Sequence, residues 1–119
     1  MDERKLGVIE ARFADLIWQN EPLSSGALVR LCETELGWKK STTYTVLKKL
    51  CERGIFRNEG GEVTSLVSRD GFYAMQSERF VEESFDGSLP AFIAAFATRK
   101  TLTAEEIAEI RRMIDRMEG

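Results

Sequence analysis

Basic and hydroxyl side chains alternate along residues 38–50, in types that suit contact with DNA. Their spacing places five of them on one face of a helix: Lys40, Ser41, Tyr44, Thr45 and Lys48. Lysine ammonium groups pair with phosphates, and short hydroxyl side chains can reach base edges in the major groove. The face holds no Arg, Asn or Gln, so the strongest two-point base contacts are missing from it. The pattern favours DNA binding over its alternative, a solvated helix face in a protein-binding domain.

The charge distribution supports the same interpretation. The net charge is −3, yet residues 37–58 hold six basic side chains against one acidic side chain. A basic segment on an acidic body is typical of small nucleic-acid binders. We therefore predict double-stranded DNA as the partner, with contacts from Lys39, Lys40, Ser41, Thr42, Tyr44, Thr45, Lys48, Lys49 and Arg57.

Catalytic chemistry has little support in this composition. The chain has no histidine, which removes the Ser-His-Asp and Cys-His mechanisms and the commonest metal ligand. Its two cysteines, Cys32 and Cys51, form no Cys-x-x-Cys clip, and a cysteine-only zinc site needs more thiolates. We expect both to pack as small apolar groups, the alternative being a redox switch at Cys51 beside Lys48 and Arg53. We predict a protein that is not an enzyme and that uses no cofactor and no metal.

Length and hydropathy bound the architecture. A chain of 119 residues fits one domain, or a small domain with an oligomerising appendage. No apolar run approaches the roughly 20 residues that a membrane helix needs. No secretory signal follows the charged first five residues. We expect no membrane insertion and a cytoplasmic location.

Three helices are predicted in the first half of the chain. Apolar side chains including Val8, Ile9, Phe13 and Trp18 recur at helical spacing over residues 7–20, before Pro22. Ser24 is a suitable N-cap for a second helix that ends before Gly37, and Ser41 for a third over residues 42–53. Short helices with tight connections indicate a helix-turn-helix.

A hairpin is predicted to follow the third helix. Residues 55–57 and 63–67 flank the pair Gly60-Gly61, which tolerates the positive φ angles of a tight turn. The predicted fold is mainly α with a small β-hairpin. It comprises a winged helix-turn-helix over residues 1–68 and a helical region over residues 69–119.

The C-terminal region combines three capped helices with a dense apolar stripe. Ser68, Ser88 and the capping box Thr103-x-x-Glu106 mark the helix starts. Helices this short cannot bury both faces within one chain, so we predict a homodimer, the alternative being that the stripe docks on the winged helix. The predicted interface comprises Phe80, Val81, Phe85, Leu89, Phe92, Ile93, Phe96, Ile107, Ile110 and Ile114.

The order and spacing of these motifs resemble the penicillinase-repressor family of bacterial transcription regulators. The resemblance is carried by Glu10-x-x-Phe13-x-x-Leu16-Ile17-Trp18, by Trp38 and the run from Ser41 to Leu50, by the segment from Phe85 to Phe92, and by Leu102-Thr-x-x-Glu106-Ile107. It implies a dimeric repressor with an N-terminal winged helix and a C-terminal dimerisation domain that binds palindromic operators.

The resemblance also implies a membrane sensor protease as a possible partner, with three departures from the family pattern. Relatives that respond to antibiotics are cut at an Asn-Phe bond, and the matching bond here is Ala95-Phe96. The C-terminal cysteine cluster of the copper-responsive branch and the basic residues of many wings are missing. We predict a homodimeric DNA-binding repressor that blocks promoters; the alternative is a winged-helix interaction module without DNA binding.

Overall fold

The computed structural model describes residues 6–118. The residues up to Gln76 form one compact unit, here unit 1, and those from Ser77 onward form another, unit 2. The boundary expected at residue 68 marks the end of the predicted wing. The packing boundary falls after Gln76 because the first two turns of the next helix pack on unit 1.

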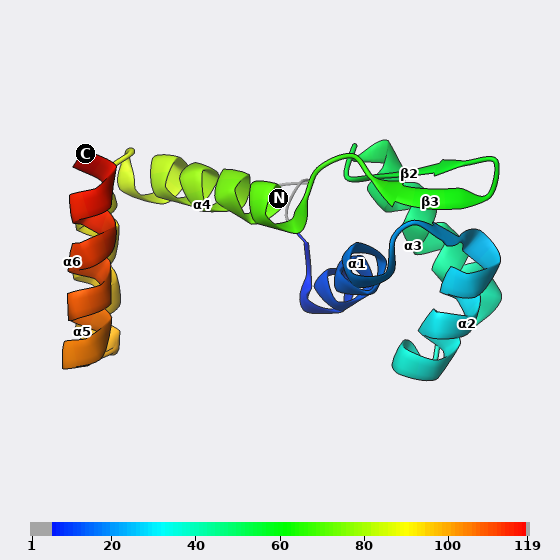
Figure 1. The fold of residues 1–119 in the computed structure, drawn as a ribbon, viewed down its shortest axis with the longest axis horizontal. Coiled ribbons are helices and arrows are strands. Elements are labelled where there is room, and N and C mark those ends of the chain that lie inside the picture. The colour runs from blue at the N-terminus through cyan, green and yellow to red at the C-terminus, as the bar shows by residue number, and fades with distance from the viewer. Residues whose placement is uncertain (1–5, 119) are drawn as a thin grey trace. The chain divides into compact units, whose positions relative to one another are not determined.

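Unit 1 is a winged helix (Figure 1). Its helices are α1 (Val8–Asn20), α2 (Ser25–Leu36) and α3 (Lys40–Glu52). Its strands are β1 (Leu23–Ser24), β2 (Phe56–Glu59) and β3 (Glu62–Ser65), which form an antiparallel sheet in the order β1-β3-β2. The turn between β2 and β3 uses Gly60 and Gly61 at φ angles of 61° and 83°, as the hairpin prediction requires.

One hydrophobic core joins the helices and the sheet of unit 1. Its fully buried side chains include Phe13 and Ile17 of α1, Leu28 of α2, Leu50 of α3 and Val63 of β3. The core also receives α4 (Arg69–Phe85), because Phe72 is only 3% exposed. The predicted α-helical fold with a small hairpin is confirmed.

The start of α4 is fastened to α1 by polar contacts as well as by packing. The indole Nε1 of Trp18 donates to the carbonyl of Val67 at 3.0 Å, and the Trp18 ring lies 5.8 Å from that of Phe72. Arg69 pairs with Asp15, with 2.8 Å between Nε and Oδ1. These contacts explain why unit 1 extends past the wing.

Three local expectations differ from the structure. Helix α3 begins at Lys40 with Lys39 as N-cap, so Ser41 lies in its first turn instead of capping it. Trp38 stacks on Phe13 with ring centroids 5.4 Å apart, which fixes the chain just before α3. The two-residue strand β1 was not predicted, because so short a segment has no periodicity.

The third difference concerns the first turn of α1. Val8 and Ile9 were expected on its inner face, but they are 80% and 50% exposed. The first buried side chain of α1 is Phe13, so the residues of its first turn precede the part of the helix that packs in the core.

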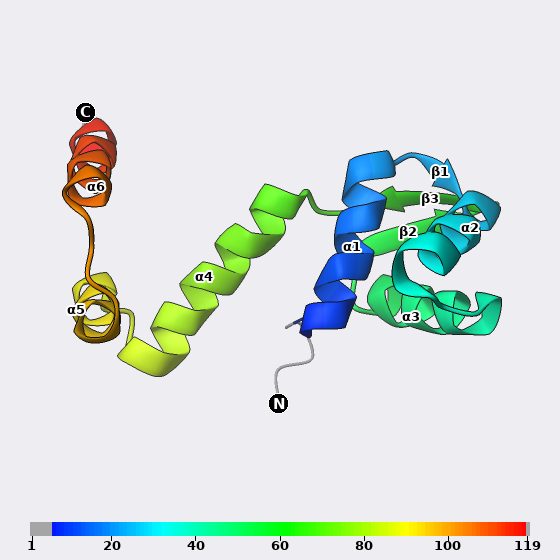
Figure 2. The same ribbon diagram turned by 90° about the horizontal axis from the view of Figure 1, so that it is seen from below.

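Unit 2 comprises the rest of α4, α5 (Leu89–Arg99) and α6 (Ala104–Glu118) (Figure 2). The predicted caps are present: the Ser88 hydroxyl accepts from the Ala91 N–H, and Thr103 and Glu106 form a reciprocal capping box. Phe92 lies within 5.8 Å of Phe80 and 5.6 Å of Phe85, between ring centroids. Among residues 77–117, no side chain is fully buried. Unit 2 therefore lacks a closed core of its own.

Candidate nucleic-acid interface

Helix α3 turns a polar face to solvent and an apolar face to the core. Thr43, Leu47 and Leu50 are at most 2% exposed and pack inward. The side chains on the solvent side are exposed: Lys39, Lys40, Ser41, Thr42, Thr45 and Lys48. The structure thus brings six of the nine predicted DNA contacts together on an accessible surface, at the N-cap and along α3.

Tyr44 lies at the edge of this face and is half-buried. Its hydroxyl lies 3.2 Å from the Oγ of Ser25, at the start of α2. The backbone N–H of Ser25 donates in turn to the carbonyl of Gly61, in the wing turn, at 2.8 Å. Tyr44 therefore connects α3, α2 and the wing, a role that its sequence position did not reveal.

The predicted cations fall into two groups. Lys49 and Arg57 are engaged by carboxylates, at 3.2 Å from Glu10 and 3.2 Å from Glu59 respectively. Lys39, Lys40 and Lys48 have no ion pair with any residue in the described range 6–118. The second group carries the positive charge that is free to attract phosphate.

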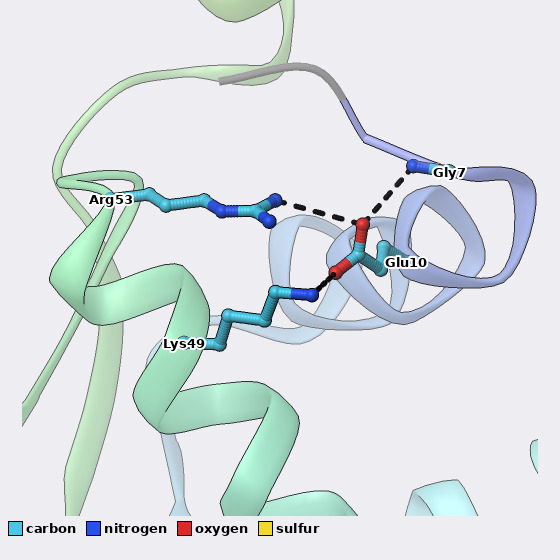
Figure 3. Close-up of polar contacts among 4 residues, drawn as sticks. All are labelled: Gly7, Glu10, Lys49 and Arg53. Carbon is cyan, nitrogen blue, oxygen red and sulfur yellow. Dashed lines mark hydrogen bonds and ion pairs between the residues drawn. The ribbon is translucent and has the colours of Figure 1, made fainter. Parts of the chain in front are cut away.

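Glu10 joins α1 to the last turn of α3 (Figure 3). Its Oε1 accepts from the N–H of Gly7 at 3.1 Å and lies 3.6 Å from Nη1 of Arg53. Partial burial acts to raise the pKa of Glu10, but the Gly7 hydrogen bond and the charges of Lys49 and Arg53 outweigh it. The pKa consequently lies below its ordinary value, and the carboxylate is charged at neutral pH.

A groove of about 370 Å³ runs beside α3 and is lined by Tyr44, Leu47, Lys48, Cys51 and Asn58. Burial raises the pKa of the Cys51 thiol and also that of Cys32. Cys32 is fully buried, as expected, and Cys51 is half-buried. A raised pKa disfavours the reactive thiolate, so plain packing accounts for both cysteines.

The residues that sequence reasoning missed are the internal partners Glu10 and Ser25, together with Asn58, which lines the groove. The spacing of Lys49 and Arg53, four residues apart at the end of α3, indicates that a carboxylate lies near both, but not that this carboxylate is Glu10. Two like charges at this spacing repel each other, and a bridging carboxylate relieves the repulsion.

The predicted dimer-interface residues divide by exposure. Leu89, Ile93, Phe96 and Ile114 are between 38% and 54% exposed, and Phe80 is 47% exposed. The remaining predicted side chains are half-buried: Val81, Phe85, Phe92, Ile107 and Ile110. Leu89, Ile93 and Phe96 share one side of α5, and we call these three the α5 apolar face. Phe92 points instead into the aromatic cluster with Phe80 and Phe85.

The described residues offer neither a metal-binding cluster nor a membrane-spanning helix. Within residues 6–118, no group of three or more acidic or cysteine side chains is placed to hold a metal ion. None of the described helices combines the length and the hydropathy that crossing a bilayer demands.

Comparison with known proteins agrees with this geometry. The family model described as penicillinase repressor matches residues 6–116. A curated protein named penicillinase repressor, from Bacillus licheniformis, is 20% identical over 110 residues, which is 89% of this chain and 86% of the relative. The fold defines a winged-helix protein, and the family match makes it a regulatory protein and not an enzyme. The chain belongs to the penicillinase repressor family.

Proposed function

We propose that this protein is a homodimeric transcriptional repressor that binds a palindromic operator and occludes the promoter. One observation carries the proposal: the exposed face of α3 presents hydroxyls of Ser41, Thr42 and Thr45 beside the ammonium group of Lys48, which has no ion pair among the described residues. Such a face fits the major groove, with hydroxyls at base edges and lysines at phosphates. A repressor of this kind binds its operator in the cytoplasm, where bacterial DNA lies.

We assign the phosphate contacts to Lys39, Lys40 and Lys48. Among the predicted DNA contacts, these are the cations without a carboxylate partner in the described residues. Lys49 and Arg57 are not counted, since each already pairs with a carboxylate. With few strong base readers, one winged helix binds weakly. Two linked copies gain the second half-site at a high effective concentration, which raises the affinity by orders of magnitude.

Dimerisation is proposed through unit 2. Leu89 and Phe96 on the α5 apolar face are 54% and 48% exposed, and Ile114 of α6 is 47% exposed. Exposed apolar side chains on helices without a closed core are what an obligate dimer buries against its copy. A membrane sensor protease is a further proposed partner. The Ala95-Phe96 bond, which the resemblance matches to the Asn-Phe cleavage bond of the family, lies within α5.

The test begins with selection of bound duplexes from a random pool by the full chain. We expect one palindromic sequence to be enriched, and a dimer in sedimentation. Lys48→Ala should lower the slope of log K against log salt by about 0.9, while Lys100→Ala in unit 2, a matched loss of charge, should not. A monomer that is not retained on any duplex at low salt would instead favour the protein-interaction module.

A further inference from the structure

A single carboxylate from α1 holds two cations at the end of α3, Lys49 in its last turn and Arg53 at its C-cap. Lys49 Nζ lies 3.2 Å from Oε2 of Glu10, and Arg53 Nη1 lies 3.6 Å from Oε1. The Arg53 side chain is 16% exposed, and its Nη1 has no hydrogen bond, so Glu10 is its only charged partner in the described residues. The Lys49 side chain is 54% exposed, so its ammonium group faces both Glu10 and solvent.

Lys49 lies next to the proposed DNA face. It follows Thr45 by one helical turn and Thr42 by two turns along α3, and both threonines are exposed. A lysine at this position is within reach of a phosphate of any sequence once its ammonium group is released. The carboxylate that competes for it is fixed in place, because Gly7 and Arg53 also hold Glu10.

We propose that Glu10 is a positioning residue that withholds Lys49 from DNA phosphates. Binding then releases fewer counterions from DNA than the number of basic residues in the interface implies. The affinity for DNA of any sequence is lower as a result. This inference rests on the proposed function, because it concerns the same face of α3.

The direct test is Glu10→Gln in the full chain. Glutamine still accepts from the Gly7 N–H, as in a capping box, but it carries no charge to hold Lys49. We expect the slope of log K against log salt on random duplex DNA to steepen by about 0.9. The affinity gain over the wild type should consequently grow about threefold between 200 and 50 mM salt.

Lys49→Met shows whether Lys49 carries the effect. In the wild type this substitution should leave the salt slope unchanged, since Lys49 is held by Glu10. In the Glu10→Gln background it should remove the added slope. Glu52→Gln is the matched control, because Glu52 is an exposed carboxylate of α3 with no ion pair in the described residues. In the Glu52→Gln background, Lys49→Met should leave the salt slope unchanged, as it does in the wild type.

The outcomes separate this inference from the proposed function. A wild-type chain that binds no duplex overturns both. A wild type that binds, with a Glu10→Gln variant whose slope is unchanged, overturns the inference alone. A lower salt slope in the single variant Lys49→Met also overturns the inference. This measurement does not depend on whether Glu10→Gln folds. If Glu10 had a purely structural role, Glu10→Gln would weaken binding at an unchanged slope, which would overturn the inference.

Discussion

The hydroxyl of Tyr44 is expected to act inside the protein, so Tyr44→Phe and Tyr44→Ala should affect DNA binding differently. The hydroxyl lies 3.2 Å from Ser25 Oγ, which is long for an O–H···O bond. Its loss should therefore cost about 0.5 kcal/mol, at the low end of the range for a single hydrogen bond. For a unit of this size that corresponds to a fall of about 2–4 °C in the unfolding temperature.

The ring should matter more than the hydroxyl for DNA recognition. Tyr44 borders the α3 face and lines the groove beside Lys48. We expect Tyr44→Ala to narrow the free-energy gap between the selected operator and random duplex by about 1 kcal/mol or more, and Tyr44→Phe to leave the gap unchanged. Competition binding with the two duplexes measures the gap, and thermal unfolding measures the stability.

Ser25→Ala provides the matched control, because it removes the other end of the same hydrogen bond. The double variant Tyr44→Phe with Ser25→Ala should be no less stable than the less stable single variant, since the two changes remove one interaction. If Tyr44→Phe narrowed the operator gap as much as Tyr44→Ala does, the hydroxyl would be a base contact and this reasoning would be wrong.

Three further predictions concern other parts of the molecule. A fragment of residues 1–76 should fold and bind operator and random duplex with equal affinity. A fragment ending at residue 68 lacks the buried Phe72, so its free energy of unfolding should be lower by about 1.5–3 kcal/mol, as measured by urea unfolding. Ile93→Asp on the α5 apolar face should weaken dimerisation at least about a hundredfold in sedimentation, because each copy would bury a carboxylate. Ala94→Asp, on another side of α5, should leave dimerisation unchanged. Equal effects of the two variants would place the interface elsewhere. Glu10→Gln should lower the free energy of unfolding at neutral pH. Because the pKa of Glu10 in the folded protein lies below its ordinary value, the stabilisation is present above that ordinary value. It is lost as the pH falls through the native pKa, so the two proteins should be equally stable in acid.

The helices and the wing could be predicted because strong local signals mark them. Ser24 and Ser88 precede regular apolar patterns, and both cap a helix in the structure. Gly37 adopts a left-handed conformation with φ of 67° after α2, as its position predicted. These signals depend on residues within one or two turns of each other, so the sequence displays them directly.

The parts that could not be predicted depend on packing between distant residues. Helix α3 begins at Lys40, shortly after Trp38, which stacks on the distant Phe13, and the partner of Lys49 comes from α1. On the sequence alone, Lys48 and Lys49 are equivalent cations. Only the fold shows that Lys49 faces a carboxylate, whereas Lys48 has no ion pair within the described part of the chain. The exposed, polar face of α3 was therefore predictable, but not which of its cations have a carboxylate partner.

The location of the aromatic core has a spectroscopic consequence. Both tryptophans of the chain, Trp18 and Trp38, lie in unit 1, and so do its two tyrosines. Unit 2 contains phenylalanines alone, which contribute almost nothing to emission excited at 295 nm. Intrinsic fluorescence thus follows the melting of the winged helix, while far-ultraviolet circular dichroism records the helices of both units. Comparing the two signals in one sample would show, without any label, whether unit 2 melts separately and whether its transition alone moves with protein concentration.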